Sequence, residues 1–227
     1  MPVALITGGA GTLGVAVARR LMHDGWAVVL ADVDIAGAEG AAKSLGGNAS
    51  AVRMDVTNLG EVRAGVDGVV RRFGGIDAVI AAAGGRSGAG AGPFMEAPPK
   101  TWTQIVELHL TGVLNVYYSA LQHMREKRSG SLIAISAVEA YRGLPESAAF
   151  STAKGAVAVL TETLVRECQP HNIRVNSVIS PTAESLARSG RNDGAIAVAE
   201  AIAFLVSDKA SLTTGAAIDV SNGWALH

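Results

Sequence analysis

The chain has 227 residues, 49% of them hydrophobic and 17% charged, with a net charge of −1. This composition excludes a disordered chain, and the length predicts one α/β domain over residues 1–227. The balanced charge indicates neither a nucleic acid nor an anionic membrane as a partner. A single cysteine, Cys168, excludes an internal disulfide framework and a cysteine-built metal site, and we predict no metal. Since we find neither a secretion signal nor an apolar run of about 18 residues, we expect a cytoplasmic protein.

Short apolar runs alternate along the chain with segments whose apolar residues recur at helical spacing. We predict strands at 3–7, 27–31, 51–54, 78–82, 131–135, 173–179 and 217–220. We predict helices at 13–23, 35–45, 58–73, 102–128, 151–169 and 195–207. Glycine and proline dominate from 84 to 99, which we predict to be a surface loop.

Repeated β-α-β units with nearly continuous apolar strands are typical of a parallel sheet with helices on both faces. Because crossovers between parallel strands are right-handed, the predicted fold is a single-domain, doubly wound Rossmann fold with a parallel seven-stranded sheet. Ligands of such folds bind at the carboxyl ends of the strands.

The first predicted strand leads into a glycine-rich turn, Thr7-Gly8-Gly9-Ala10-Gly11-Thr12-Leu13-Gly14. Glycine allows a positive φ and a close approach of the backbone to a pyrophosphate, and the helix that follows offers free N–H groups. Asp32 ends the second strand, where a carboxylate can accept hydrogen bonds from an adenosine ribose. The turn and Asp32 together predict a dinucleotide site. The alternative is that the glycines only form a tight turn and Asp32 is a solvated strand end.

From these residues onward the chain resembles the short-chain dehydrogenase/reductase family over nearly its whole length. Gly8 and the segment Gly11-Thr12-Leu13-Gly14 match the family's glycine loop, and Asp55-Val56 resembles its adenine-contacting pair. Ala82-Ala83-Gly84 resembles the fourth-strand Asn-Asn-Ala-Gly motif without either asparagine. Further family landmarks follow in order at Gly92-Pro93-Phe94, Trp102, Thr111-Gly112, Arg174-Val175-Asn176-Ser177 and Phe204-Leu205-Val206-Ser207-Asp208.

The resemblance implies a nicotinamide dinucleotide, bound by the glycine loop, Asp32, Asp55-Val56, the Ala82–Gly84 segment and Lys154. Members that prefer NADP usually carry a basic residue in the loop or just after the second strand, and Ala10 and Val33 stand in those places. A 2′-phosphate beside Asp32 would be repelled and would find no cation. We therefore predict NAD as the cofactor.

The resemblance also implies hydride transfer, with a tyrosine as the general acid/base, a lysine four residues later, a serine that holds the substrate oxygen and an asparagine that supports a proton relay. Lys154 is present, but Phe150, Ala137 and His109 occupy the tyrosine, serine and asparagine places. Ser136 is one position from the serine place, so on a strand its side chain would point to the opposite face. The pattern indicates lost chemistry with a retained nucleotide cradle, because Lys154 can still bind the nicotinamide ribose.

Two further departures concern the end of the chain. After the sixth strand the family usually has Pro-Gly and a long substrate lid, whereas here Ser180-Pro181-Thr182 is followed about a dozen residues later by the next helix. We therefore expect a shortened lid that excludes water poorly. We interpret Trp224-Ala225-Leu226-His227 and the apolar face of the 151–169 helix as subunit contacts, the latter because the family's tetramers use such helix bundles.

Other side chains could replace the lost acid/base. Tyr141 follows the serine place, His109 can titrate near neutral pH, and Glu139 is near Tyr141 in the sequence. Each also has a plainer interpretation: a partly exposed loop tyrosine, a histidine packed on its helix, and a solvated carboxylate. We interpret Cys168 as a buried or interface thiol, because no activating base stands at helical spacing from it.

Three functions are compatible with this pattern. The one we favour is a non-catalytic or weakly catalytic subunit, in a homo- or hetero-oligomer, that pairs with an active NAD(P)-dependent homologue. The first alternative is an active NAD-dependent alcohol dehydrogenase or ketoreductase that uses Tyr141 or His109. The second alternative is a nucleotide-binding regulatory protein.

Overall fold

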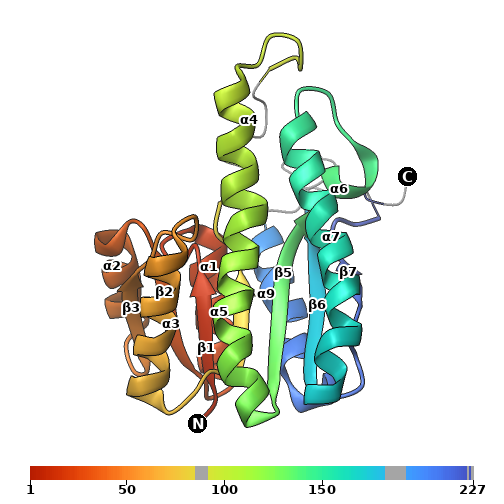
Figure 1. Ribbon diagram of the computed structural model, residues 1–227. Coiled ribbons are helices and arrows are strands. Elements are labelled where there is room, and N and C mark those ends of the chain that lie inside the picture. The colour runs from red at the N-terminus through yellow and green to blue at the C-terminus, as the bar shows by residue number, and fades with distance from the viewer. Residues whose placement is uncertain (85–91, 182–192, 224, 226–227) are drawn as a thin grey trace.

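A computed structural model of the chain describes residues 1–84, 92–181, 193–223 and 225. Within these residues the strands form one seven-stranded sheet in the order β3-β2-β1-β4-β5-β6-β7 (Figure 1). Every neighbouring pair is parallel. The α/β doubly wound Rossmann fold predicted from the sequence is therefore confirmed.

The strands lie close to their predicted positions. They are β1 (Val3–Thr7), β2 (Ala27–Asp32), β3 (Ala49–Arg53), β4 (Ala78–Ala81), β5 (Gly130–Ala137), β6 (Ile173–Ser180) and β7 (Ala217–Asp219). The helices are α1 (Thr12–His23), α2 (Ile35–Leu45), α3 (Leu59–Phe73), α4 (Pro99–Val106), α5 (Gly112–Lys127), α6 (Glu139–Arg142), α7 (Ala148–Cys168) and α9 (Gly194–Val206).

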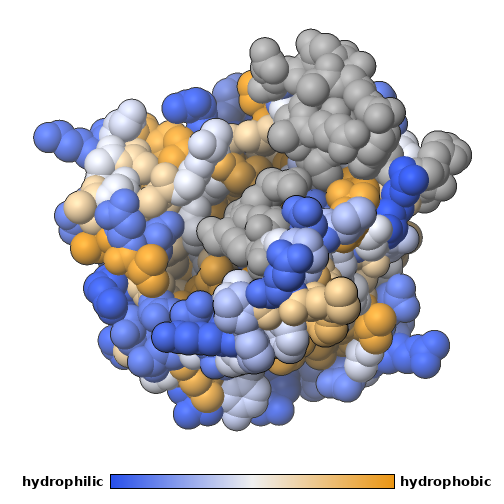
Figure 2. All heavy atoms as spheres, turned by 90° about the horizontal axis from the view of Figure 1, so that it is seen from above, coloured by the Kyte–Doolittle hydropathy of each residue, from blue (hydrophilic) through white to orange (hydrophobic). Residues whose placement is uncertain are grey.

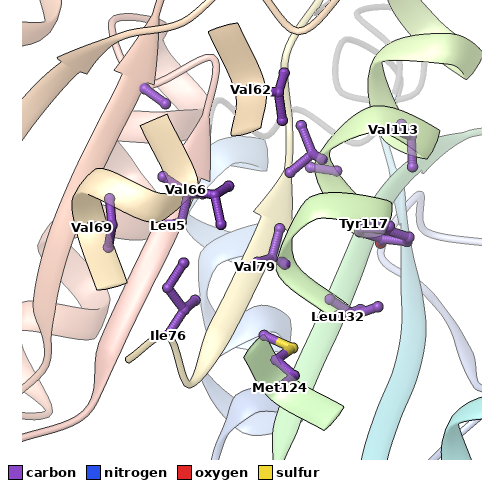
Figure 3. Packing of buried hydrophobic residues seen from close by; sticks show 14 of the residues in the cluster. Leu5, Val62, Val66, Val69, Ile76, Val79, Val113, Tyr117, Met124 and Leu132 are labelled. Atoms are coloured by element: carbon purple, nitrogen blue, oxygen red, sulfur yellow. The ribbon is translucent and has the colours of Figure 1, made fainter. Parts of the chain in front are cut away.

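The sheet has an apolar core on each face, because successive side chains of a strand point to opposite sides. Leu5 of β1 belongs to a cluster with side chains of α3, α5 and α7. Figure 3 shows from close by the part of this cluster that lies between the sheet and helices α3 and α5. The neighbours of Leu5 in β1, Ala4 and Ile6, belong to a second cluster with α1, α2 and α9. Figure 1 shows α3, α5 and α7 in front of the sheet, while α1 and α9 lie behind it. Burial on both faces explains why β1 is apolar from Val3 to Ile6.

The long helix predicted at 102–128 is interrupted. It begins earlier, as α4, and a five-residue π-helical segment, Glu107–Thr111, joins α4 to α5. At its end the N–H of Gly112 bonds to the carbonyl of Glu107, five residues back. A Cβ on Gly112 would lie 2.7 Å from Cγ2 of Val56. The wider turn therefore accompanies close packing of this helix on the end of β3, and such π turns are often found at functional sites.

Two smaller differences also concern the elements. The sequence did not predict α6, whose four residues are too few to show a helical period. The third strand begins and ends slightly earlier than predicted, at Ala49–Arg53. No helix in the described ranges has both the length and the apolar character needed to cross a membrane.

Candidate functional site

A cleft of about 620 Å³ opens at the carboxyl ends of the central strands. It lies across the point where β1 connects to α1 on one face of the sheet and β4 connects toward α5 on the other, which is where such folds bind ligands. Figure 2 looks down on this end of the molecule. The cleft brings together every residue predicted to bind the cofactor, namely Gly8, Gly11, Thr12, Leu13, Gly14, Asp32, Asp55, Val56, Ala82, Ala83, Gly84 and Lys154.

The glycine turn leaves the start of α1 open toward the cleft. Gly11 is the N-cap residue and has no side chain to bond the first helical N–H groups. Those groups, together with the positive end of the helix dipole, suit a pyrophosphate. A Cβ on Gly14 would lie 2.4 Å from the carbonyl oxygen of Gly8, so only glycine fits there without a shift of the turn. The close packing of the glycine turn therefore leaves the backbone N–H groups at the start of α1 accessible to a phosphate, as predicted.

The turn is also tied to the end of β4. Thr7 Oγ1 accepts hydrogen bonds from the N–H groups of Ala82 and Ala83, both at 3.1 Å. Gly8 has a φ of +70°, and a Cβ on it would lie 2.7 Å from the carbonyl oxygen of Ala82. The backbone of Ala82-Ala83-Gly84 thus forms a wall of the cleft without the asparagines that the resemblance leads one to expect.

Asp32 is held in place by the backbone around it. Its Oδ2 accepts from the N–H of Ala10 at 3.0 Å, and its Oδ1 accepts from the N–H of Asp34 at 3.0 Å. Each carboxylate oxygen keeps a further lone pair that can accept from a ribose hydroxyl. Val33 lines the cleft beside it and carries no charge.

Asp55 and Val56 form the wall after β3. Asp55 Oδ1 accepts from the N–H and the hydroxyl of Thr57, which fixes a tight turn. The side-chain amide of Asn115, on α5, donates to the carbonyl of Val56 at 2.9 Å. The sequence carries no signal for this role of Asn115, because the contact joins elements far apart in the chain.

Lys154 lies at the other end of the cleft, after β5. Its ammonium donates to the carbonyl of Ile135 at 2.8 Å and lies 5.7 Å from the ring centroid of Phe150. Burial lowers the pKa of Lys154 to about 8, although the nearby carboxylate of Glu139 acts in the opposite direction. Phe150 packs with Ala137 and Ile105 in an apolar cluster. The places in which the family resemblance implies hydroxyl groups are therefore filled by hydrocarbon.

His109 is fully buried behind this cluster, in the π-helical segment. Its ring meets the ring of Phe150 edge-on, with the centroids 4.9 Å apart. A Cβ on Gly84, whose φ is +105°, would lie 2.5 Å from Cε1 of His109, so the glycine makes room for the imidazole. His109 is not among the residues that line the cleft, and its interpretation as a packed histidine is confirmed.

Tyr141 lies in α6 and does not line the cleft either. It is 44% exposed, which confirms the partly exposed tyrosine of the plainer interpretation, but it lies in a short helix and not in a loop. Burial of part of the ring raises the pKa of Tyr141, and interactions with Ser136 and Ser177 partly offset that rise. A raised pKa is unfavourable for a general base at neutral pH.

The plainer interpretation of Glu139 as a solvated carboxylate is wrong. Glu139 is 2% exposed and lines the cleft. Ser136, which we expected to face away, is also part of the lining. Helix α6 begins almost directly after β5, so the chain turns at this end of the sheet. The periodicity of the apolar residues does not predict that turn.

Cys168 is buried, and burial raises the pKa of its thiol to about 11, which agrees with an inert thiol. No cluster of metal-binding side chains occurs among the residues that the structure describes. The predicted short lid (182–192) lies outside those residues, as do residues 85–91 of the predicted loop and positions 224, 226 and 227 of the tail.

Residues 2–194 match the short chain dehydrogenase family. The chain belongs to the short-chain dehydrogenases. It is 35% identical to the cis-4-hydroxycyclohexanecarboxylate dehydrogenase of Sinomonas cyclohexanicum, and the match covers 98% of this chain and 96% of that enzyme. It is 30% identical to a 3-alpha-(or 20-beta)-hydroxysteroid dehydrogenase of Mycobacterium bovis, with coverage of 97% and 88%.

Solved structures of short-chain dehydrogenases superpose closely on this fold. A 3-ketoacyl-(acyl-carrier-protein) reductase from Brucella melitensis, complexed with NADH, is 30% identical with a TM-score of 0.91, and 99% of this chain and 98% of that chain are covered. An NAD⁺-bound xylitol dehydrogenase is 27% identical with a TM-score of 0.87 and 98% coverage of both chains. These neighbours bind NAD(H), which supports a nicotinamide cofactor for the cleft of this family member.

Proposed function

We propose that this short-chain dehydrogenase homologue binds NAD(H) but is a non-catalytic or weakly catalytic subunit that pairs with an active NAD(P)-dependent homologue. One observation carries the proposal. The ring of Phe150 is buried beside the ammonium of Lys154, where an acid/base hydroxyl would be needed. Phenylalanine has no proton to transfer, so no change of its surroundings can restore that step.

The size of the expected loss supports this proposal. Removal of a positioned acid/base typically slows a reaction by roughly 10² to 10⁴-fold, and loss of a hydrogen-bond donor to the reacting oxygen by about 10² to 10³-fold. Phe150 and Ala137 together take away both contributions. A nicotinamide cofactor, when bound, supplies hydride transfer, but this chain would hold it without hydroxyl groups at positions 150 and 137 to handle the accompanying proton.

The residues at the end of β2, where the adenosine ribose would bind, support NAD over NADP. The Asp32 carboxylate is fixed at the end of β2, and its neighbour Val33 is uncharged. A 2′-phosphate placed there would meet a negative charge without a compensating cation from these two residues.

A shortened lid is the second part of the proposal. The alignment with the Sinomonas enzyme spans 241 positions, more than the 227 residues of this chain, so that enzyme has residues for which this chain has none. A missing lid segment would leave water near the reacting atoms and would further weaken catalysis.

Pairing is supported by exposed apolar side chains on one layer of the fold. Leu114 and Tyr118 of α5 and Val159 of α7 are exposed, and both helices cover the same face of the sheet (Figure 1). Exposed large apolar side chains on one layer of a fold are a feature of interaction surfaces. We infer that a homologous subunit packs there.

The first test measures binding and turnover in the same purified chain. We expect NADH to bind more tightly than NADPH in calorimetry, and no oxidation of a broad panel of alcohols by the isolated chain. Activity should appear only when the chain is combined with a tyrosine-containing homologue. The double variant Phe150→Tyr with Ala137→Ser restores both hydroxyls and should gain at least about 10²-fold in turnover. Phe94→Tyr, which adds a phenol at an exposed site away from the cleft, is the matched control.

The opposite outcome would favour an active dehydrogenase. Robust turnover by the unmodified chain, lost on His109→Ala or Tyr141→Phe, would assign the acid/base role to that side chain. Binding without turnover in any combination of subunits would instead indicate a nucleotide-binding regulatory protein.

A further inference from the structure

Two oppositely charged side chains are buried in the wall of the cleft after β5. Lys154 is 5% exposed and Glu139 is 2% exposed, and both line the cleft. The negative charge of the Glu139 carboxylate attracts the ammonium of Lys154 and thereby favours the charged form of the lysine. Burial of a carboxylate costs free energy that hydrogen bonds and opposite charges must offset. Glu139 is therefore a buried charged group in the cleft wall that the proposed function does not yet use.

The other acidic side chains of the described cleft wall belong to its opposite end. Asp32 and Asp55 follow β2 and β3, whereas Glu139 follows β5. Strands β1 and β4 lie between β2 and β5, so the two ends are about 14 Å apart at the usual strand spacing. A dinucleotide whose adenosine lies at Asp32 extends across the switch point and brings its nicotinamide toward β5.

We propose that Glu139 makes this site selective for the oxidised form of the nicotinamide dinucleotide over the reduced form. The proposal rests on the cofactor site proposed above. The nicotinamide ring carries a positive charge when oxidised and is neutral when reduced. The negative charge of Glu139 attracts the oxidised ring, whereas the positive charge of Lys154 alone would repel it. Glu139 therefore acts as a specificity-determining residue and takes no part in proton transfer.

The test compares the affinities for NAD⁺ and NADH, each measured separately by calorimetry. In Glu139→Gln the preference for NAD⁺, expressed as the ratio of the two dissociation constants, should fall by about tenfold relative to the unmodified chain, within the usual range of such couplings. Glu139→Asp keeps the charge and should retain most of the preference. Glu162→Gln makes the same chemical change at an exposed position of α7 and should leave the ratio unchanged.

Each other outcome has a definite meaning. An unchanged ratio in Glu139→Gln, or an equal loss of affinity for both forms, would overturn the inference while leaving the cofactor site intact. If Glu139→Gln does not fold, loss of the preference in Glu139→Asp would overturn it in the same way. An unmodified chain that binds neither form would remove the proposed function itself, and this inference would fall with it.

Discussion

At the scale of single residues, the site contains Lys154 of the family's tyrosine–lysine pair, while Phe150 occupies the place of the tyrosine. Lys154 stays buried, donates to the carbonyl of Ile135 and faces hydrocarbon at Phe150. A buried ammonium is less stable in the folded chain than in water, and the lowered pKa of about 8 records that cost. Retention of such a residue is more easily explained by ligand binding than by stability.

The lowered pKa of Lys154 predicts a pH-dependent stability. Between about pH 8 and pH 10.5 the unfolded chain binds more protons at this residue than the folded chain does, so the folded state gains stability as the pH rises. The pKa of Lys154 falls from 10.5 to about 8 on folding. Relative to Lys154→Met, the unfolding free energy of the unmodified chain should therefore increase by about 3 kcal/mol between these two pH values. Urea denaturation at a series of pH values measures this difference.

The matched control for this measurement is Lys43→Met, at an exposed position of α2. Lys43→Met makes the same chemical change at an exposed site, so it should not reproduce the rise expected from the buried Lys154. A flat difference for Lys154→Met as well would mean that the ammonium is solvated in the folded protein.

At the scale of elements, the turn between β1 and α1 determines whether the cleft can hold a pyrophosphate. The N–H of Gly11 bonds to the carbonyl of Gly8 and closes the turn, and the same carbonyl leaves no room for a Cβ on Gly14. The turn, the start of α1 and the end of β4 therefore form one packed unit. A change at one glycine is expected to reach the whole unit.

We expect Gly14→Ala to destabilise the fold by about 1–3 kcal/mol, since its new methyl group would overlap the carbonyl of Gly8 and force the turn to move. The same shift should abolish binding of NADH, which a fluorescence titration would detect. Gly40→Ala is the control, because Gly40 lies inside α2 with open space around it. Alanine there should stabilise the helix by roughly 0.5–1 kcal/mol and leave binding unchanged. Equal behaviour of the two variants would contradict the packed turn.

At the scale of the whole molecule, most of the fold could be predicted from the sequence, because buried parallel strands and amphipathic helices leave clear periods. The glycine loop and Asp32 could be placed in one cleft for the same reason, since parallel strands end at a common edge. The position of Glu139 could not be predicted, because a four-residue helix decides it. The π turn at His109 was missed because one inserted residue barely disturbs the apolar pattern of the long helix.

Two exposed apolar side chains of α5 lead to a prediction about assembly. The exposed Tyr118, 52% accessible, lies one turn after Leu114 on α5, so both point from the same side of that helix. We expect light scattering at micromolar concentration to give the mass of a dimer or tetramer, or of a mixed oligomer when an active homologue is present. The double variant Leu114→Glu with Tyr118→Glu should shift this mass toward the monomer, since charges within an apolar interface must be desolvated. Lys43→Glu changes the charge on the other face of the sheet and should leave the mass unchanged. A monomeric unmodified chain, alone and with its homologue, would contradict the pairing and with it the role of a partner subunit.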